Sequence, residues 1–253
     1  MTELSKKEIE NLRICGRILR KSLKDAIAAI KPGISSLVID QIAEKSLRKN
    51  GAAPSFLNYP SHNNNRFPNS ICISINNEVV HGIPNKDKII REGDIVGIDL
   101  GAEHKGVYTD MAETIIVGKP KQKSDTILVS VAKYALNEGI KRAIEGNTTG
   151  DIGYSIQKYV ESKGFNVVRA LVGHGIGKAP HTDPQIPNFG ERSTGTILKN
   201  NCAIAIEPMI VSGHYDVFTL NDGWTVSTKD GSNSAHFEHT VLINKNSPEI
   251  VTK

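Results

Sequence analysis

Residues 93–118 read GDIVGIDLGAEHKGVYTDMAETIIVG, and this stretch decides which fold the sequence predicts. Two apolar runs flank the polar turn AEHKG, which indicates two antiparallel strands joined in a hairpin. Asp99 and Asp110 lie on the two strands, and the midpoint between them falls between His104 and Lys105, at the tip. A hairpin centred there places the two carboxylates directly opposite each other on one face of the sheet.

The surroundings of the two aspartates favour a bound metal ion. Like charges that face each other repel, so the arrangement requires a cation, a shared proton or open water between them. The alternative is that both aspartates simply face solvent. Residues 95–98 and Val107 are apolar, and an apolar setting favours a metal site over a solvated pair.

Three further side chains complete a candidate ligand set. Glu207 ends the apolar strand CAIAIE, and Glu238 is embedded in apolar neighbours, where an unpaired charge is costly. His174 sits in GHGIG, whose glycines let the backbone fold tightly around the imidazole. Oxygen and imidazole ligands favour Mn, Fe(II), Co or Zn, and carboxylates can bridge two ions about 3.5 Å apart. The predicted metal ligands are Asp99, Asp110, His174, Glu207 and Glu238.

Two other motif interpretations of these segments are weaker. Residues 173–177 have the spacing of a glycine-rich phosphate loop, but the second position is histidine and no suitable Gly-Lys-Ser/Thr or ribose-binding acid follows. Residues 236–239 read HFEH, which lacks the spacing of an HExxH zinc helix and lies in a predicted strand.

Helical pairs are predicted on both sides of the hairpin. Ser5 and Glu8 have capping-box spacing, and apolar residues then recur at three- and four-residue steps until Pro32-Gly33. The other predicted helices cover 36–50, 124–145 and 151–163. The predicted strands cover 71–75, 94–100, 107–117, 167–171, 202–207, 215–219 and 236–243. The segment 59–69 is rich in Pro, Asn and Ser and is predicted to be a long loop.

The two helical pairs indicate an internal duplication. Residues 29–51 and 143–164 share the order helix, break, helix and glycine stop, offset by about 114 residues. The alternative is that two helical hairpins look alike by chance. We therefore predict one α+β domain over residues 1–253, with halves of about 1–120 and 121–253 and the site between them.

Composition places the chain among globular proteins of the cytoplasm. The 253 residues include 31 basic and 27 acidic side chains, for a formal net charge of +4. This mild excess is typical of solvated lysines, and we expect no DNA binding. Three dispersed cysteines indicate reduced thiols, and neither a signal peptide nor an apolar run of membrane-spanning length is evident. We expect a cytoplasmic monomer without a membrane partner.

Nearly the whole chain resembles the type I methionine aminopeptidases of the pita-bread family. The likeness is carried by SINNEVVHGIP (74–84), the hairpin at 93–118, GHGIGKAPHTDPQIPN (173–188), IEPM (206–209) and DGWTVSTKDGSNSAHFEHT (222–240). It implies a pita-bread fold with a central antiparallel sheet covered by helices in pseudo-two-fold related halves. It also implies removal of the initiator methionine from nascent polypeptides when the second residue is small, and a transient ribosome contact.

The resemblance also implies a role for each site residue. Asp110 and Glu238 would bridge two divalent ions, Asp99 would complete one, and His174 and Glu207 would bind the other. Glu207 would accept the proton of a bridging water. His81 would meet the scissile nitrogen, and His181 would stabilise the tetrahedral intermediate. The methionine pocket would be lined by Tyr59, Phe67, Cys72 and Trp224, with Phe56 as a looser candidate; without the resemblance these five indicate plain core packing.

Two departures and two competing functions accompany the resemblance. The segment 60–66, PSHNNNR, is longer than the family's link, and Pro180 replaces an aromatic pocket residue of some relatives. An Xaa-Pro peptidase of the same fold uses a similar ligand set but usually carries an additional N-terminal domain. A metal-free binding paralogue would be expected to lose ligands, whereas all five positions are filled here.

Overall fold

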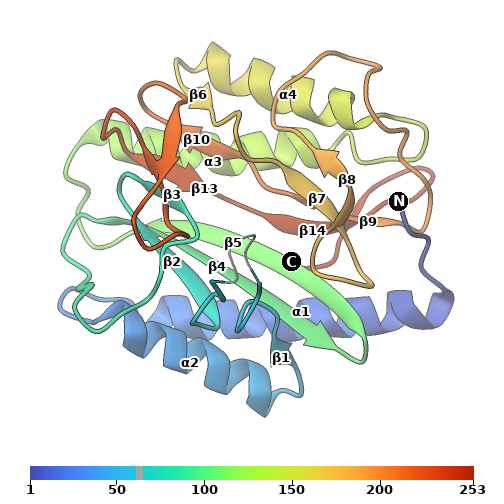
Figure 1. The fold of residues 1–253 in the computed structure, drawn as a ribbon. Helices are drawn as coiled ribbons and strands as arrows, with labels where there is room; N and C mark the ends of the chain where they lie inside the picture. The colour runs from blue at the N-terminus through green and yellow to red at the C-terminus, as the bar shows by residue number, and fades with distance from the viewer. Residues whose placement is uncertain (61–64) are drawn as a thin grey trace.

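The structure is a computed structural model that describes residues 1–60 and 65–253. Its four long helices form two pairs on opposite sides of a layer of strands, with the blue pair below and the green-to-yellow pair above in Figure 1. The helices are α1 (Lys6–Ala29), α2 (Ser36–Lys49), α3 (Lys123–Ile140) and α4 (Thr149–Ser162). Mixed helices and antiparallel sheets confirm the predicted α+β class.

The helix boundaries follow capping chemistry that the sequence displays. The Ser5 hydroxyl accepts from the amide of Glu8, whose carboxylate accepts from the Ser5 amide, as the capping box predicted. Thr148 and Asp151 cap α4 in the same way. The predicted helix 124–145 instead ends at Ile140, after which the Arg142 and Ala143 amides donate to carbonyls three residues back rather than four. The Glu145 amide donates to Asn244, across the molecule.

Every pairing between named strands in the described residues is antiparallel. One sheet has the order β1 (Ala53–Pro54), β4 (Ile95–His104) and β2 (Ile71–Ile75), with β5 (Val107–Ile116) also paired to β4. A second has the order β15 (Glu249–Ile250), β14 (His239–Leu242), β9 (Ala203–Ile206), β7 (Gly173–Ile176) and β8 (Thr182–Ile186). Two smaller sheets are β13 (Ser234–His236), β10 (Met209–Val211) and β6 (Asn166–Val167), and β11 (Val217–Thr219), β12 (Val226–Thr228) and β3 (Glu78–Val80).

The two larger sheets meet along β5 and the segment before β14. The Glu238 amide donates to Ala112 O at 3.0 Å, and the Asp110 amide donates to Thr240 Oγ1 at 2.8 Å. Helices α1 and α2 bury their apolar faces in the cluster that contains Ile71, Ile98 and Leu100, and α3 and α4 pack on the cluster that contains Ile204 and Ile206. The junction of the sheets is therefore enclosed by one helical pair on each side.

Several predicted strands differ from the structure. Of the predicted strand 167–171 only Val167 lies in a strand, β6, and the predicted strand 236–243 is divided into β13 and β14 around Glu238. Strands β1, β3, β7, β8, β10, β12 and β15 were not predicted. His174 lies in strand β7, one of the strands that were not predicted, between Gly173 and Gly175. Glycine has little intrinsic preference for strands, and here the pairing of β7 with β9 decides its conformation.

The predicted long loop lies partly outside the described residues, which exclude 61–64. Its flanks are paired, because the Phe67 amide donates to Tyr59 O and the Asn58 amide donates to Phe67 O, both at 2.9 Å. Among the residues described, no helix combines the length and apolar character that a membrane crossing requires.

Candidate metal centre

A cavity of about 210 Å³ lies at the junction of the sheets. It contains every residue that the sequence put forward for ligand binding, catalysis or the methionine pocket, and the looser candidate Phe56 as well. Its lining residues are Phe56, Tyr59, Phe67, Cys72, His81, Asp99, Asp110, His174, His181, Glu207, Trp224 and Glu238. Tertiary folding thus gathers residues that are separated by up to 182 positions (238 − 56) into one site.

The two aspartates of the β4–β5 hairpin share a face but are not directly opposite. Asp99 pairs with Ala112, and Asp110 pairs with Gly101, so the carboxylates are diagonal neighbours. The prediction of direct opposition was wrong because the turn consists of Lys105 and Gly106, one position beyond the assumed tip. Both turn residues have positive φ, of 50° and 78°, as a two-residue hairpin turn requires. The shift is even in register, so both side chains still point into the cavity.

Asp99, Asp110 and Glu238 form a buried group of carboxylates. Each has an oxygen within 4.8 Å of the others, and their exposed fractions are only 8%, 3% and 2%. Asp99 Oδ1 and Glu238 Oε1 are buried and have no hydrogen-bond partner among the described residues. Burial raises the pKa of Asp99 to about 7 and raises the pKa values of Asp110 and Glu238 well above their usual range. Three such groups with unpaired oxygens fit a bound divalent cation.

His174 and Glu207 face the carboxylates from the second sheet. Their Nε2 and Oε1 atoms lie 3.5 Å apart, and both residues belong to a second group of candidate ligands with Glu238. His174 Nδ1 bonds to Gly175 O at 3.0 Å, so Nδ1 carries the proton and Nε2 is free to bind a metal. Burial opposes the charge of Glu207, but the neighbouring imidazoles of His236 and His174 outweigh it and lower the pKa of this carboxyl.

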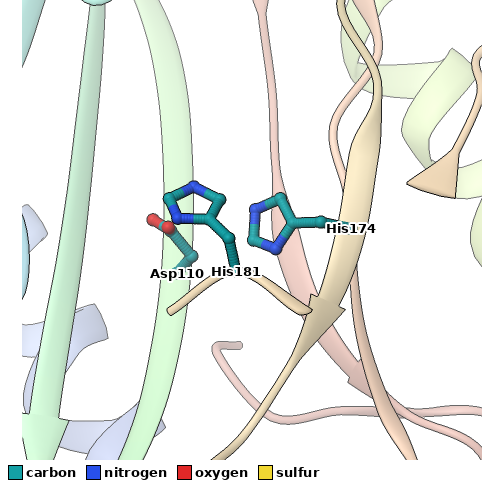
Figure 2. A group of neighbouring side chains, drawn as sticks. All are labelled: Asp110, His174 and His181. Atoms are coloured by element: carbon teal, nitrogen blue, oxygen red, sulfur yellow. The ribbon is translucent and has the colours of Figure 1, made fainter. Parts of the chain in front are cut away.

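His181 joins a third group of candidate ligands with Asp110 and His174. Figure 2 shows its imidazole beside that of His174, and the ring centroids are 4.3 Å apart. The sequence did not predict His181 as a ligand, although its place in this group suits a ligand as well as a hydrogen-bond donor. The side chain opens to solvent at the cavity mouth, yet the surrounding protein and His174 lower its pKa to about 4. His181 is therefore neutral near pH 7 and carries one N–H.

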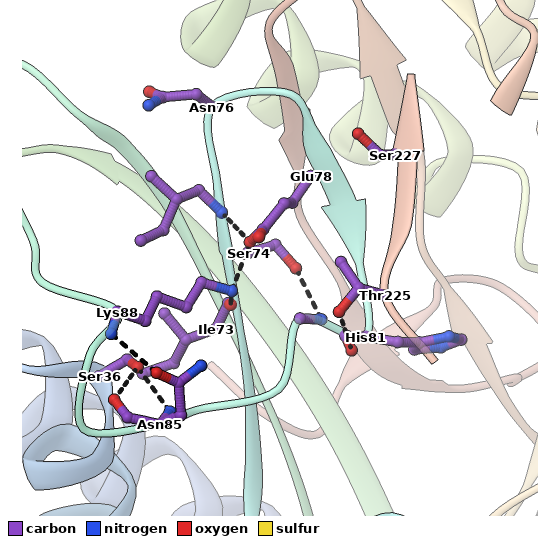
Figure 3. Close-up of polar contacts among 12 residues, drawn as sticks. Ser36, Ile73, Ser74, Asn76, Glu78, His81, Asn85, Lys88, Thr225 and Ser227 are labelled. Carbon is purple, nitrogen blue, oxygen red and sulfur yellow. Dashed lines mark hydrogen bonds and ion pairs between the residues drawn. The ribbon is translucent and has the colours of Figure 1, made fainter. Parts of the chain in front are cut away.

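His81 enters the cavity from a fixed, left-handed turn. Its φ is 57°, and the next residue is tied down on both sides. The Gly82 amide donates to Ser74 Oγ at 3.2 Å, and Gly82 O accepts from the Ile73 amide at 2.8 Å. Figure 3 shows the Lys88 side chain beside Ile73 and Glu78, and its Nζ contacts Ile73 O at 2.7 Å and Glu78 at 2.5 Å. Burial lowers the pKa of His81, which favours its neutral form.

Aromatic rings form an apolar wall beside the metal ligands. The Phe67 ring lies 5.3 Å from that of Trp224 and 6.5 Å from that of Phe56, both edge to face. Cys72 packs with them, and it pairs with Asp99 across β2 and β4. Burial and the nearby Asp99 raise the pKa of the Cys72 thiol well above its usual range, so it remains protonated. These side chains form an apolar chamber that opens directly onto the carboxylates.

Sequence reasoning missed one residue that contacts this site. His236 is buried, and its Nε2 lies 3.6 Å from Glu207 Oε2. The only signal in the sequence was a second histidine in HFEH, which the spacing argument treated solely as a rejected zinc motif. Its relation to Glu207 depends on the pairing of β10 with β13, which the sequence did not predict.

Comparison with known proteins agrees with this geometry. Residues 10–245 match the family model of metallopeptidase family M24. The chain is 44% identical to a methionine aminopeptidase of Clostridium acetobutylicum over 245 residues, which cover 97% of this chain and 96% of that relative.

Two solved structures share this fold, but they differ in how similar their sequences are to this chain. The crystal structure of a methionine aminopeptidase from Thermotoga maritima matches with a TM-score of 0.96 and 40% identity, and the match covers 100% of this chain and 99% of that one. An Xaa-Pro dipeptidase from Bacillus anthracis matches with a TM-score of 0.79 and 22% identity, over 99% of this chain but only 62% of that one. The second likeness concerns the fold alone, and both confirm the predicted pita-bread architecture.

Proposed function

The chain belongs to metallopeptidase family M24, and from this premise we propose that it removes the N-terminal methionine from proteins and peptides in a metal-dependent reaction. The observation that carries the proposal is a single cavity in which an apolar aromatic chamber adjoins five oxygen and nitrogen ligands. The identity to methionine aminopeptidases over almost the full length of both chains supports the same function. The enzyme is thus a hydrolase of the aminopeptidase class.

The residues present fit two divalent ions. Asp110 and Glu238 are assigned to both ions, Asp99 to one, and His174 and Glu207 to the other. The groups of candidate ligands support this division, because Asp99, Asp110 and Glu238 form one group, whereas His174 and Glu207 form another that also contains Glu238. Bound ions would lower the pKa of a coordinated water and would polarise the substrate carbonyl. The all-oxygen and imidazole set favours Mn, Fe(II), Co or Zn.

The chain's own groups then perform the proton transfers. Glu207, whose pKa is lowered, accepts the proton of the attacking water. His181 is neutral and donates its N–H to the oxyanion that develops on the methionine carbonyl. The proton that Glu207 takes from the water passes to the leaving nitrogen as the peptide bond breaks, and neutral His81 orients that nitrogen through a hydrogen bond. Its fixed backbone holds the imidazole ready for this contact.

The apolar chamber is assigned to the methionine side chain. A flexible thioether packs well against aromatic edges, which Phe67 and Trp224 supply. Tyr59 lies between this chamber and the catalytic end, with its ring 5.0 Å from that of His181. Cys72 and Phe56 fill the remaining wall. We further propose that the crowded site admits only a small second residue.

Nascent polypeptide N-termini are the proposed substrates, and the cytoplasm is the proposed location. The three cysteines are free and buried, which suits a reducing compartment. A transient ribosome contact and a monomeric state belong to the same proposal.

A matched pair of peptides tests the proposal. The purified protein is incubated with Met-Ala-Ser and with an Xaa-Pro peptide, with and without Mn²⁺ or Co²⁺, and released amino acids are quantified. We expect release of methionine from Met-Ala-Ser only when metal is present. Preferential cleavage of the Xaa-Pro peptide would assign the chain to the alternative peptidase class. Absence of hydrolysis with either peptide and either metal would favour a binding paralogue.

A further inference from the structure

His236 is a buried polar side chain that the mechanism above does not use. Only 3% of its surface is exposed, and its Nε2 has no hydrogen-bond partner among the described residues. This nitrogen lies 3.6 Å from Glu207 Oε2, while the other oxygen, Oε1, lies 3.5 Å from His174 Nε2. The Glu207 carboxylate thus has one imidazole near each of its oxygens.

The backbone of His236 is fixed, so its approach to Glu207 follows from the fold. Strand pairing places His236 opposite Met209, two residues beyond Glu207. Thr114 Oγ1 accepts from the His236 amide at 3.0 Å and donates to His236 O at 2.6 Å. On the other side, Asn188 Nδ2 donates to Glu207 O at 3.1 Å. Neither main chain can move away without breaking these contacts.

Resting on the proposed function, we propose that His236 is a positioning residue that donates its Nε2–H to Glu207 Oε2. A buried N–H without an acceptor is costly, and Glu207 Oε2 is the acceptor in front of it. The present distance is longer than a hydrogen bond, as catalytic contacts often are before substrate binds. The contact fixes the carboxylate so that Oε1 faces His174. Glu207 is thereby held in one orientation for metal binding and for proton acceptance.

A direct ligand role suits His236 less well. None of the groups of candidate ligands found among the described residues includes it, whereas Glu207 belongs to one. Groups that orient metal ligands from behind typically change metal affinity or activity by about 10–100-fold when they are removed. The proposal therefore predicts that metal affinity and activity both fall when the hydrogen-bond donor at position 236 is removed.

Two variants of nearly equal size separate the donor from its packing. His236→Gln keeps an N–H donor, whereas His236→Met does not, and thermal melts verify that both are folded. Mn²⁺ affinity is measured by calorimetry, and kcat and KM are measured on Met-Ala-Ser. We expect His236→Met to weaken binding of one Mn²⁺ by about tenfold and to lower kcat by about tenfold with little change in KM. His236→Gln should remain within about threefold of the parent in both measurements.

A neighbouring histidine supplies the matched control. His239 is also largely buried, but its Nδ1 bonds to Thr252 Oγ1 at 2.9 Å, outside the cavity. We expect His239→Met to lower thermal stability without changing kcat per metal-loaded enzyme. Equal losses of Mn²⁺ affinity and kcat in His236→Gln and His236→Met would overturn the proposal, as would no loss in either variant. Complete loss of one ion in His236→Met would also overturn it, because His236 would then be a metal ligand. If the parent fails to cleave Met-Ala-Ser, the proposed function fails, while the Mn²⁺ titration still decides the role of His236.

Discussion

His174 and His181 lie seven positions apart (181 − 174), and their rings are 4.3 Å apart, yet their surroundings differ. His174 is fixed by Gly175 through Nδ1, and its Nε2 faces Glu207. His181 stands at the mouth of the cavity beside Tyr59. Both belong to the group of candidate ligands with Asp110. Distances within that group therefore do not show which histidine binds metal and which donates a hydrogen bond to the substrate. Substituting each histidine in turn distinguishes the two roles.

His181→Ala is expected to lower kcat on Met-Ala peptides by about 100-fold while both metal ions stay bound, because an oxyanion donor acts in the transition state. His174→Ala should lose metal as well as rate. Metal content after dialysis and steady-state kinetics measure the two effects. If His181→Ala lost metal and His174→Ala kept it, the two roles would have to be exchanged.

Asp110→Asn and Glu238→Gln should each remove more metal than Asp99→Asn, because the first two are assigned to both ions. All three side chains are buried in one group, so burial alone does not distinguish them. Elemental analysis after dialysis against a weak chelator gives the number of ions per chain. Two tightly held ions in Asp110→Asn would contradict the bridging assignment.

Strands β2 and β3 and the segment that follows them hold His81 in place. Lys88 reaches back from this segment to Ile73 O and Glu78, and its side chain is only 14% exposed. Removing one partner of a buried ion pair leaves the other charge uncompensated. The turn at His81 and Gly82 packs directly against this pair, so the element and the catalytic side chain are coupled.

Lys88→Met is expected to lower the free energy of unfolding by about 1–3 kcal/mol, since the ion pair is largely but not fully buried. It should also lower kcat, because the turn that carries His81 loses its support. Urea denaturation and kinetics on Met-Ala-Ser measure both. Lys86→Met is the matched control, since Lys86 is exposed and two residues away. An equal effect in both variants would exclude a specific role for Lys88.

The cavity lies where two sheets join, and its carboxylates are buried there. Their negative charges lower the stability of the fold when no metal ion compensates them. Asp99 ionises with a pKa of about 7 in the folded chain, against about 3.9 in an unfolded one. The unfolded state therefore releases this proton at lower pH. The contribution of Asp99 to the free energy of unfolding is therefore fully present below about pH 4 and is lost as the pH rises toward 7. Asp110 and Glu238, whose pKa values are also raised, act in the same direction.

Metal binding should reverse this loss, so Mn²⁺ is expected to raise the melting temperature more at pH 7.5 than at pH 5.5. Binding requires deprotonated carboxylates and relieves their repulsion. Thermal melts of chelator-treated protein with and without Mn²⁺, at both pH values, provide the measurement. A larger Mn²⁺ effect at pH 5.5 would contradict the assignment of these carboxylates as ligands.

The arrangement of helices and sheets supports a proposal of internal duplication. Each larger sheet is covered by one helical pair, and the metal ligands come from both sheets. We propose that the halves, about 1–120 and 121–253, arose from one helical-hairpin-and-sheet unit. A pair of such halves places a site at their junction, which is where the cavity lies.

Local chemistry in the sequence was sufficient for much of this protein. The Ser5–Glu8 capping box predicted the start of α1, and two apolar runs around a polar turn predicted the hairpin that carries Asp99 and Asp110. Charged side chains in apolar runs indicated the candidate ligands, because an uncompensated buried charge is costly. The aromatic chamber and the roles of His81 and His181 came from the family resemblance.

Tertiary structure alone decided the features that depend on partners distant in the chain. The segment after α3 is held by a bond from the Glu145 amide to Asn244 O, and strand β7 exists because it pairs with β9. The diagonal placement of the two aspartates depends on the position of the hairpin turn, which lies one residue beyond the midpoint between Asp99 and Asp110. His236 carries no distinguishing signal in the chain, and it contacts Glu207 only because β10 and β13 pair in one register. Hydrogen bonds and contacts between remote segments set these features, and local residue preferences do not encode them.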